Sequence, residues 1–366
     1  MIYLDNGATS FRKPTAVYRA VQNAMVSCAN PGRGGYLYAS NAADVVFECR
    51  EQAGKLFDCL PEQVILTTSC THGLNTAIRT LVKPGSTVVI SGFEHNAVTR
   101  PLHALGAKIR IAGRKLFDWQ DTLESFEGLI NGAEAAVFTH VSNVFGYILP
   151  VQQLAAICRE RGIPFIIDAA QSAGSLPVSL SELGADFIAM PGHKGLLGPQ
   201  GTGLLLCGRG GEPLLYGGTG SFSREQTMPP ELPDRLEAGT LNVPGYAGLR
   251  EGLRYLNQAG VDRIFRREHR LLRQCIRGLE KAGMKVFAGP HQAATVSFLP
   301  GTDCEEAAEY LAKQGIAVRA GLHCAPYAHE SAGTLETGTV RVSVGYDTFP
   351  GRIAAFLRAA SKLPRF

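Results

Sequence analysis

Two residues of the chain, Asp168 and Lys194, have the types and spacing that a Schiff-base cofactor requires. Asp168 ends the apolar run IPFIID, and Lys194 lies in the glycine-flanked sequence GHKG after the apolar run DFIAMP. Both runs are typical of buried strands, and ligands of open α/β sheets bind at the carboxyl ends of strands. Pyridoxal 5'-phosphate (PLP) needs a lysine amine for its aldehyde and a carboxylate beside its pyridinium nitrogen. The pair therefore predicts a PLP site.

Each of these residues also has a purely structural interpretation. A lone lysine is more often a solvated surface residue, and an aspartate at a strand end more often caps the next helix. The joint occurrence of both residues with the GHKG turn favours the interpretation as a cofactor site.

A phosphate site is predicted in the segment LTTSCTHGLN, where a strand over 64–67 leads into a helix over 72–82. Free N–H groups at the helix N-terminus, with the hydroxyls of Ser69 and Thr71, would bind an anion. An ordinary helix cap uses the same residues, so this segment alone is weak evidence.

His95 and Asn143 each follow a predicted strand, over 87–91 and 135–141 respectively. An imidazole at the sheet edge could stack on a flat ring and transfer protons. The amide of Asn143 could hydrogen-bond the ring hydroxyl or a substrate carboxylate. A lone histidine is more often structural, so the functional interpretation of His95 depends on Lys194 and Asp168.

The composition excludes several other classes of protein. The chain has 366 residues, 45% of them hydrophobic, with a net charge of +4 and no basic block, which argues against binding nucleic acid or an acidic membrane surface. No apolar run approaches the ~20 residues of a membrane helix, and the N-terminus lacks the pattern of a secretory signal. Nine scattered cysteines without a CxxC pair argue against disulfides and a zinc site. We expect a cytoplasmic protein without a metal.

The elements that position these residues alternate between strand and helix from about residue 64 to 207. This alternation predicts the α/β class, with a mostly parallel, doubly wound sheet and helices on both faces. The glycine- and proline-rich segment 208–244 is expected to form an ordered loop region over a site. The predicted strands cover 64–67, 87–91, 108–111, 135–141, 164–168 and 186–190, and the predicted helices 72–82, 119–130 and 151–161.

A smaller α+β domain is predicted in the C-terminal part. A long helix over 246–282, interrupted near Gly260, leads to short strands over 295–298, 317–319 and 339–343, a helix over 305–314 and a terminal helix. We expect a large PLP-binding domain over 15–250. We expect residues 1–14 and 251–366 to form the small domain, with a catalytic cysteine loop at about 320–337.

Five segments together resemble one family. YLDNGATSFRKP, EHNAV, SNVFG, DAAQSAG and GHKGLLGPQGTG, in this order, are similar to the class V aminotransferase group of fold-type I PLP enzymes. Within that group the chain resembles the cysteine desulfurase and selenocysteine lyase family, nearly from end to end.

The resemblance implies a role for each residue of the cofactor site. Lys194 would form the Schiff base, Asp168 would pair with the pyridinium nitrogen, Gln171 with the phenolic oxygen, and His95 would stack on the ring and move protons. The residues that it places at phosphate are Thr71, the backbone of His72, His193 and, across a homodimer to the partner subunit, Gly239 and Thr240. Pro191 stands where the family commonly has a phosphate-binding serine, so that contact is missing or supplied elsewhere.

The segment VRAGLHCAPYAHESAG resembles the family loop that carries a sulfur-accepting cysteine. Cys324 lies there beside His323 and near His329, and cationic neighbours would lower the pKa of a loop thiol. The other eight cysteines are expected to be inert. Leu322 replaces the first histidine of a His-His-Cys found in many relatives. Arg341 matches the arginine that binds the substrate carboxylate, which a bidentate guanidinium suits, and Arg319 matches a second one.

The implied activity is a PLP-dependent cysteine desulfurase, which converts L-cysteine to L-alanine and transfers sulfur as a persulfide to Cys324. The short loop resembles that of relatives stimulated by a separate sulfur-acceptor protein. The alternatives are a selenocysteine lyase acting on L-selenocysteine, another class V aminotransferase or lyase, and a degenerate sulfur-carrier or structural relative. The intact Lys194, Asp168, His95 and Arg341 argue against the last of these.

Overall fold

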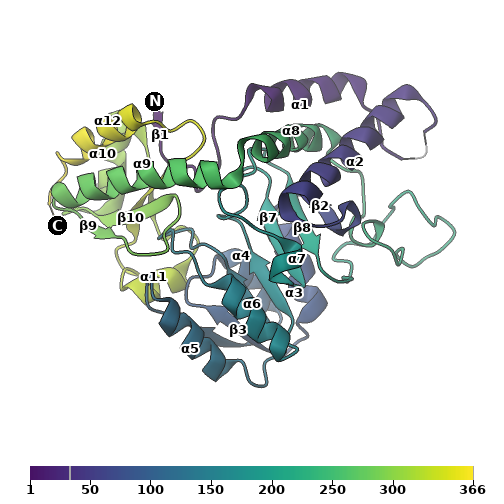
Figure 1. The fold of residues 1–366 in the computed structure, drawn as a ribbon, viewed down its shortest axis with the longest axis horizontal. Coiled ribbons are helices and arrows are strands. Elements are labelled where there is room, and N and C mark those ends of the chain that lie inside the picture. Colours follow the sequence, from purple (N-terminus) through teal and green to yellow (C-terminus); the bar gives the residue numbers. More distant parts are fainter. Residues whose placement is uncertain (33, 366) are drawn as a thin grey trace.

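A seven-stranded sheet forms the centre of the larger part of the molecule in this computed structural model, which describes residues 1–32 and 34–365 (Figure 1). Only β8 runs against its neighbours, so the prediction of a mostly parallel α/β sheet is confirmed. The strand order is β2 (Val64–Thr67), β8 (Gly203–Cys207), β7 (Phe187–Pro191), β6 (Phe165–Asp168), β5 (Ala135–Thr139), β3 (Thr87–Ser91) and β4 (Lys108–Ala112).

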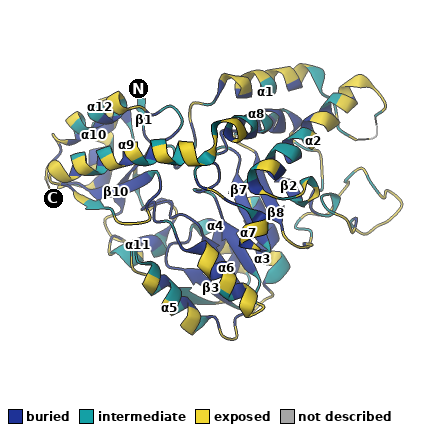
Figure 2. Ribbon diagram, in the orientation of Figure 1, coloured by how far each residue is buried: buried dark blue, intermediate teal, exposed yellow. Residues whose placement is uncertain are grey.

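Helices cover both faces of this sheet because alternate strand residues point to opposite sides. Ile65 packs in one core with α3 (Cys70–Leu81) and α4 (Asn96–Ala104). Its neighbours Val64 and Leu66 pack in another core with α5 (Trp119–Leu129), α6 (Val151–Glu160) and α7 (Leu180–Leu183). Figure 2 shows the sheet buried and the outer surfaces of α5 and α6 exposed.

A second hydrophobic core lies beside the first, around a four-stranded antiparallel sheet. Its order is β12 (Arg319–Gly321), β13 (Thr339–Ser343), β10 (Thr295–Leu299) and β9 (Lys285–Phe287), and it packs with α9 (Val261–Lys281), α10 (Cys304–Lys313) and α12 (Pro350–Ala360). The chain's first strand, β1 (Ile2–Tyr3), pairs with β11 (Ile316–Ala317), so the N-terminus joins this part of the molecule.

A third group of helices, α1 (Thr15–Ser27), α2 (Leu37–Phe57) and α8 (Val243–Ala259), packs together beside the large sheet (Figure 1). The segment between β8 and α8 loops outward, with a single 3-10 turn at Asp234–Leu236. A buried ion pair fastens its end, because Glu237 accepts hydrogen bonds from Arg50 at 2.6 and 2.8 Å and from the Leu66 N–H at 2.5 Å. In the part of the chain that the structure describes, no helix has both the length and the apolar character needed to cross a membrane.

Several elements differ from the predictions in extent, and others were not predicted. The predicted helix over 246–282 begins three residues earlier and breaks at Gly260, as expected, where φ is +78°. The predicted strand over 317–319 is divided between β11 and β12. Helices α1, α2, α4, α7 and α11 (Pro326–Ala332) and strands β1, β8 and β9 have no counterpart in the predictions.

Glu268 on α9 provides a test of stability against pH. Burial raises the pKa of this carboxyl from 4.5 to about 8, so the folded chain keeps a proton that the unfolded chain releases. The contribution of Glu268 to the free energy of unfolding therefore falls as pH rises from about 4.5 to 8. We expect Glu268→Gln to become more stable relative to the parent by a few kcal/mol between pH 5 and 8, measured by urea unfolding.

The matched control is Glu280→Gln, which changes an exposed carboxylate on the same helix. Its stability should follow that of the parent at both pH values. If Glu268→Gln and the parent had the same pH dependence, Glu268 would be ionised in the folded chain and this prediction would be wrong.

Candidate active site

Asp168 and Lys194 lie together at the carboxyl edge of the large sheet, as predicted. Asp168 is the last residue of β6, and Lys194 follows the end of the neighbouring parallel strand β7 by three residues. Burial lowers the pKa of Lys194, and the Asp168 carboxylate partly opposes this shift. A lysine with a lowered pKa spends more time as the neutral amine that attacks an aldehyde.

One oxygen of Asp168 is already bound within the protein. Oδ1 accepts hydrogen bonds from the Ala170 N–H at 2.9 Å and from the Cys70 thiol at 3.5 Å. Burial raises the pKa of Cys70 well above its ordinary value, so its sulfur keeps the proton that it donates. The carboxylate is only 2% exposed, and its Oδ2 makes no described hydrogen bond, which leaves that oxygen for the nitrogen of a bound ring.

A helix N-terminus lies in the segment predicted to bind phosphate, although this helix, α3, begins at Cys70, two residues earlier than expected. Ser69 caps it by accepting the His72 N–H at 3.1 Å, and Thr71 is exposed in the first turn. Gly203 packs against the backbone of this turn: a β-carbon at position 203 would lie 2.7 Å from the Ser69 carbonyl carbon, so there is no space for a side chain. Its partner in the β7–β8 ladder is Pro191, at a strand end, where a proline is tolerated.

His95 caps α4, four residues after the end of β3, and lies near the lysine and the aspartate. Its Nδ1 accepts the Ala97 N–H at 3.0 Å, so the neutral ring carries its proton on Nε2. Burial lowers the pKa of His95, and Asp168 opposes that shift. The preceding residue, Glu94, is fully buried with its pKa raised to about 8 by burial, and it accepts the Thr139 N–H at 2.8 Å. This bond ties the His95 turn to β5.

The N-terminal segment braces two other predicted residues. Gln171 donates from Nε2 to the Gly7 carbonyl at 2.9 Å. The Nδ1 of His193 lies 3.0 Å from the Thr9 hydroxyl, and the His193 carbonyl accepts the Ser10 N–H at 2.9 Å. Burial and the adjacent Lys194 lower the pKa of His193 to about 4, so the ring is neutral.

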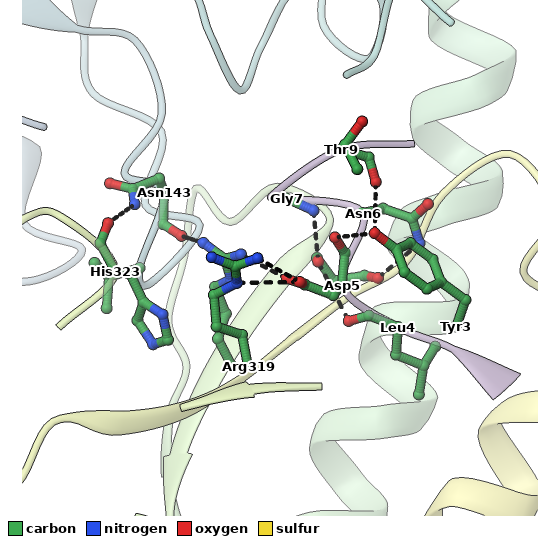
Figure 3. Close-up of polar contacts among 12 residues, drawn as sticks. Tyr3, Leu4, Asp5, Asn6, Gly7, Thr9, Asn143, Arg319 and His323 are labelled. Atoms are coloured by element: carbon green, nitrogen blue, oxygen red, sulfur yellow. Dashed lines mark hydrogen bonds and ion pairs between the residues drawn. The ribbon is translucent and has the colours of Figure 1, made fainter. Parts of the chain in front are cut away.

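Arg341 and Arg319 share one carboxylate, that of Asp5, which Figure 3 shows with Arg319. Arg341 donates from Nη2 to Asp5 Oδ1 at 2.8 Å, and Arg319 donates from Nε to Asp5 Oδ2 at 3.0 Å. Arg341 also donates from Nη1 to the Asn143 carbonyl at 2.9 Å, while the Asn143 amide donates to the His323 carbonyl at 2.7 Å. Asn143 thus links the arginines to the cysteine loop.

Cys324 is exposed, whereas the other eight free cysteines are buried or half-buried. His323 and Cys324 both have left-handed backbones, with φ of +50° and +57°, a conformation that costs energy without glycine. The structure holds this turn by two hydrogen bonds to its carbonyls, from Asn143 to His323 and from the Asn96 N–H to Cys324 at 2.7 Å. Since Asn96 follows His95, the thiol-bearing loop is fastened to the site.

The histidines of this loop do not provide the positive charge that the sequence predicted. Burial lowers the pKa of His323 to about 2 and that of His329 to about 4, so both rings are neutral. His329 is instead held in the core, with Nδ1 2.8 Å from the Thr334 hydroxyl.

Gly239 and Thr240 are exposed on the projecting loop. The Gly239 N–H donates to the Gly218 carbonyl at 2.8 Å, within the loop itself. Among the described residues, no hydrogen bond joins either residue to the site of its own chain.

The comparison with protein families agrees with this geometry. The model described as Aminotransferase class-V matches residues 2–354, nearly the whole chain. The chain belongs to the class-V aminotransferase family. A probable cysteine desulfurase of Methanothermobacter thermautotrophicus is 30% identical, with 94% of this chain and 90% of that protein covered. Another probable cysteine desulfurase, from Pyrococcus abyssi, is 32% identical, with 89% and 85% covered.

Solved structures have the same fold as this class-V aminotransferase family member. The apo cysteine desulfurase of Thermococcus onnurineus superimposes with a TM-score of 0.91 at 32% identity, with 99% of this chain and 94% of that chain covered. A cysteine desulfurase of Escherichia coli superimposes with a TM-score of 0.86 at 25% identity, over the same shares of the two chains. The predicted resemblance and fold-type I architecture are therefore confirmed.

Three residues of this class-V family member gained no role from the sequence: Asp5, Cys70 and Glu94. Asp5 contacts Arg341, Cys70 contacts Asp168, and Glu94 holds the turn before His95. These contacts arise in the folded chain and are not evident from the sequence. Asp5 lies in the YLDNGATS segment and Glu94 in EHNAV, so both were within recognised motifs. Cys70 carried the weaker signal of lying beside the predicted phosphate site.

Proposed function

We propose that this protein is a PLP-dependent cysteine desulfurase that converts L-cysteine to L-alanine and receives the sulfur as a persulfide on Cys324. The observation that carries the proposal is the fastening of an exposed cysteine to the lysine site. The Asn96 N–H binds the Cys324 carbonyl directly beside His95, and Asn143 binds the preceding carbonyl. An ordinary PLP transaminase has no need of a thiol at this place.

The residues at the sheet edge fit PLP. Lys194 would bind its aldehyde carbon, Asp168 Oδ2 its ring nitrogen, and Gln171 its phenolic oxygen. The phosphate would lie at the N-terminus of α3 beside Thr71 and His72, with His193 nearby and His95 over the ring. When bound, PLP draws electrons from the α-carbon of an amino acid and so makes its proton acidic.

The protein's own groups would then complete the reaction. Arg341 binds the substrate carboxylate, and Lys194, as a neutral amine, takes the α-proton. His95, whose neutral ring is protonated on Nε2, would transfer protons during the reaction. The Cys324 thiolate forms a bond to the substrate sulfur while the bond from sulfur to the β-carbon breaks. The α- and β-carbons end protonated, so one thiol and one cysteine give one persulfide and one alanine.

The test is alanine formation by the purified holoenzyme from L-cysteine, with a thiol reductant and no keto acid. We expect steady release of alanine and sulfide, and a separate assay with L-selenocysteine compares the two substrates. A protein that made alanine only from L-selenocysteine would be a selenocysteine lyase. A protein that needed a keto acid would be another class V enzyme, and the proposal would be wrong.

Arg341→Lys provides a test of substrate binding. Lysine retains the charge but loses the planar, two-pronged contact with a carboxylate, so we expect kcat/KM for L-cysteine to fall roughly 10²-fold, mostly through KM. Arg319→Lys is the control, because the Arg319 side chain is 50% exposed and that of Arg341 only 3%. We expect a smaller loss there. Equal losses in both variants would contradict the assignment of Arg341 as the main anchor.

We also propose a homodimer. Large apolar side chains are exposed along α1 and α2 and between them, among them Met25, Val26, Leu37 and Phe47, and such a surface favours association. The projecting loop would then carry Gly239 and Thr240 to the phosphate of the partner subunit. Light scattering of the holoenzyme would measure its mass, and a monomer at micromolar concentration would contradict this proposal.

We retain as part of the proposal residues 15–250 as the large domain and 1–14 with 251–366 as the small domain, although Leu253 and Leu256 of α8 pack in the core of the large domain. The nine free cysteines suit a reducing compartment, and we propose a cytoplasmic location. The exposed Cys324 would pass its sulfur to an acceptor protein.

A further inference from the structure

Asp5 pairs with both arginines predicted to bind the substrate carboxylate, and Figure 3 shows its contact with Arg319. Its two oxygens are divided between them, with Oδ1 2.8 Å from Arg341 Nη2 and Oδ2 3.0 Å from both Nε and Nη2 of Arg319. Asp5 is only 8% exposed. A buried carboxylate in two ion pairs is part of the site and is not a solvated surface charge.

The position of this carboxylate is fixed by the backbone around it. Asp5 forms a parallel bridge with Ser343, the Gly7 N–H donates to the Ser343 hydroxyl at 2.7 Å, and the Asn6 amide donates to the Ser343 carbonyl at 3.0 Å. Gly7 also packs against Arg341, since a β-carbon there would lie 3.2 Å from Arg341 Cζ. Asp5 therefore has little freedom to turn away when a ligand arrives.

The charges of this cluster leave one positive unit. Two guanidinium groups and one carboxylate sum to +1, which one carboxylate of a ligand would balance. Arg341 Nε is buried and has no hydrogen-bond partner among the described residues, so it remains free to donate. Burial lowers the pKa of Arg341, and Asp5 counteracts this, which helps to keep the guanidinium charged.

We propose that Asp5 is a specificity-determining residue of this site: it selects ligands with a single carboxylate and disfavours ligands with two. The proposal rests on the proposed function, because it assigns the substrate carboxylate to the arginine pair. A second carboxylate within reach of Arg319 would meet the negative charge of Asp5 in a poorly solvated place, where like charges repel strongly. L-cysteine has one carboxylate and meets the requirement.

The test compares propionate, with one carboxylate, and malonate, with two, on the holoenzyme and on Asp5→Asn. Binding is measured from the rise in the melting temperature with ligand concentration, at constant ionic strength. Asparagine is close in shape to aspartate and removes only the charge. We expect the ratio of malonate to propionate affinity to rise about tenfold in Asp5→Asn.

Two further variants serve as a control and as a second test of the proposal. Asp186→Asn removes a carboxylate paired with Arg209 at 3.1 Å, at the opposite edge of the sheet, and should leave the ratio unchanged. Arg319→Gln removes a positive charge from a half-exposed side chain and should lower the ratio, so it keeps the proposal testable if Asp5→Asn folds poorly. A merely structural role of Asp5 would change the affinities for both anions equally and would overturn the proposal.

The result of the anion-binding test can be distinguished from the result of the alanine assay that tests the proposed function. A shifted ratio in a protein that makes no alanine from L-cysteine would support the role of Asp5 in anion selection and reject the desulfurase. Alanine formation with an unchanged ratio in both Asp5→Asn and Arg319→Gln would reject the role of Asp5 and leave the desulfurase standing.

Discussion

Lys194→Ala is expected to form alanine from L-cysteine at least about 10⁴-fold more slowly than the parent, because two functions are lost at once. The amine that binds the cofactor covalently is removed, and so is the base that takes the α-proton. Lys194 is half-buried after β7 and burial lowers its pKa, which suits an amine that acts both as the covalent anchor and as the base. The measurement is alanine released per holoenzyme and the PLP retained after dialysis.

The matched control is Lys115→Ala, in which a lysine paired with Asp121 on the surface is lost. It should retain full activity and cofactor. If Lys194→Ala kept a tenth of the parent's activity, or held PLP through dialysis as firmly, the assignment of Lys194 would be wrong.

Cys324→Ala is expected to bind PLP as the parent does and yet to form alanine from L-cysteine about 10³-fold more slowly. Its thiol lies in the turn that Asn96 and Asn143 hold, and the structure describes no other exposed cysteine. Alanine substitution leaves both backbone carbonyls in place. We therefore expect the loss in kcat, with the cofactor absorbance unchanged.

Cys28→Ala, which removes a half-buried cysteine at the end of α1, is the control and should retain activity. With L-selenocysteine, Cys324→Ala should retain more activity than with L-cysteine, because selenide is the better leaving group. Undiminished alanine formation from L-cysteine would exclude Cys324 from sulfur transfer.

The sequence predicted which residues lie at the carboxyl edge of the large sheet, because the evidence there is local. Asp168 ends β6, Lys194 follows β7 by three residues, and His95 follows β3 by four, so the position of each depends on a nearby strand end. Strand β8 was not predicted because no helix separates it from β7, which breaks the alternation on which the prediction relied. Helices α1 and α2 leave apolar residues such as Met25 and Phe47 exposed, which blurs their periodicity.

Contacts between distant segments were beyond the reach of the sequence. Asp5 and Arg341 are 336 positions apart and meet only because β1 joins the second core. The charge of His323 was equally hidden: the sequence predicted a cationic neighbour for Cys324, whereas the neutral state of His323 follows from its burial. The sequence thus predicted the candidate reacting groups, whereas their charge states and partners depend on the fold.

The central claim is that Cys324 receives the substrate's sulfur. The most direct measurement is mass spectrometry of the holoenzyme after a short incubation with L-cysteine without reductant, followed by trapping of thiols and peptide mapping. We predict that the peptide with Cys324 gains the mass of one sulfur atom, in step with the alanine released. Alanine formation with that peptide unchanged, or with the added sulfur on another cysteine such as Cys70, would contradict the account.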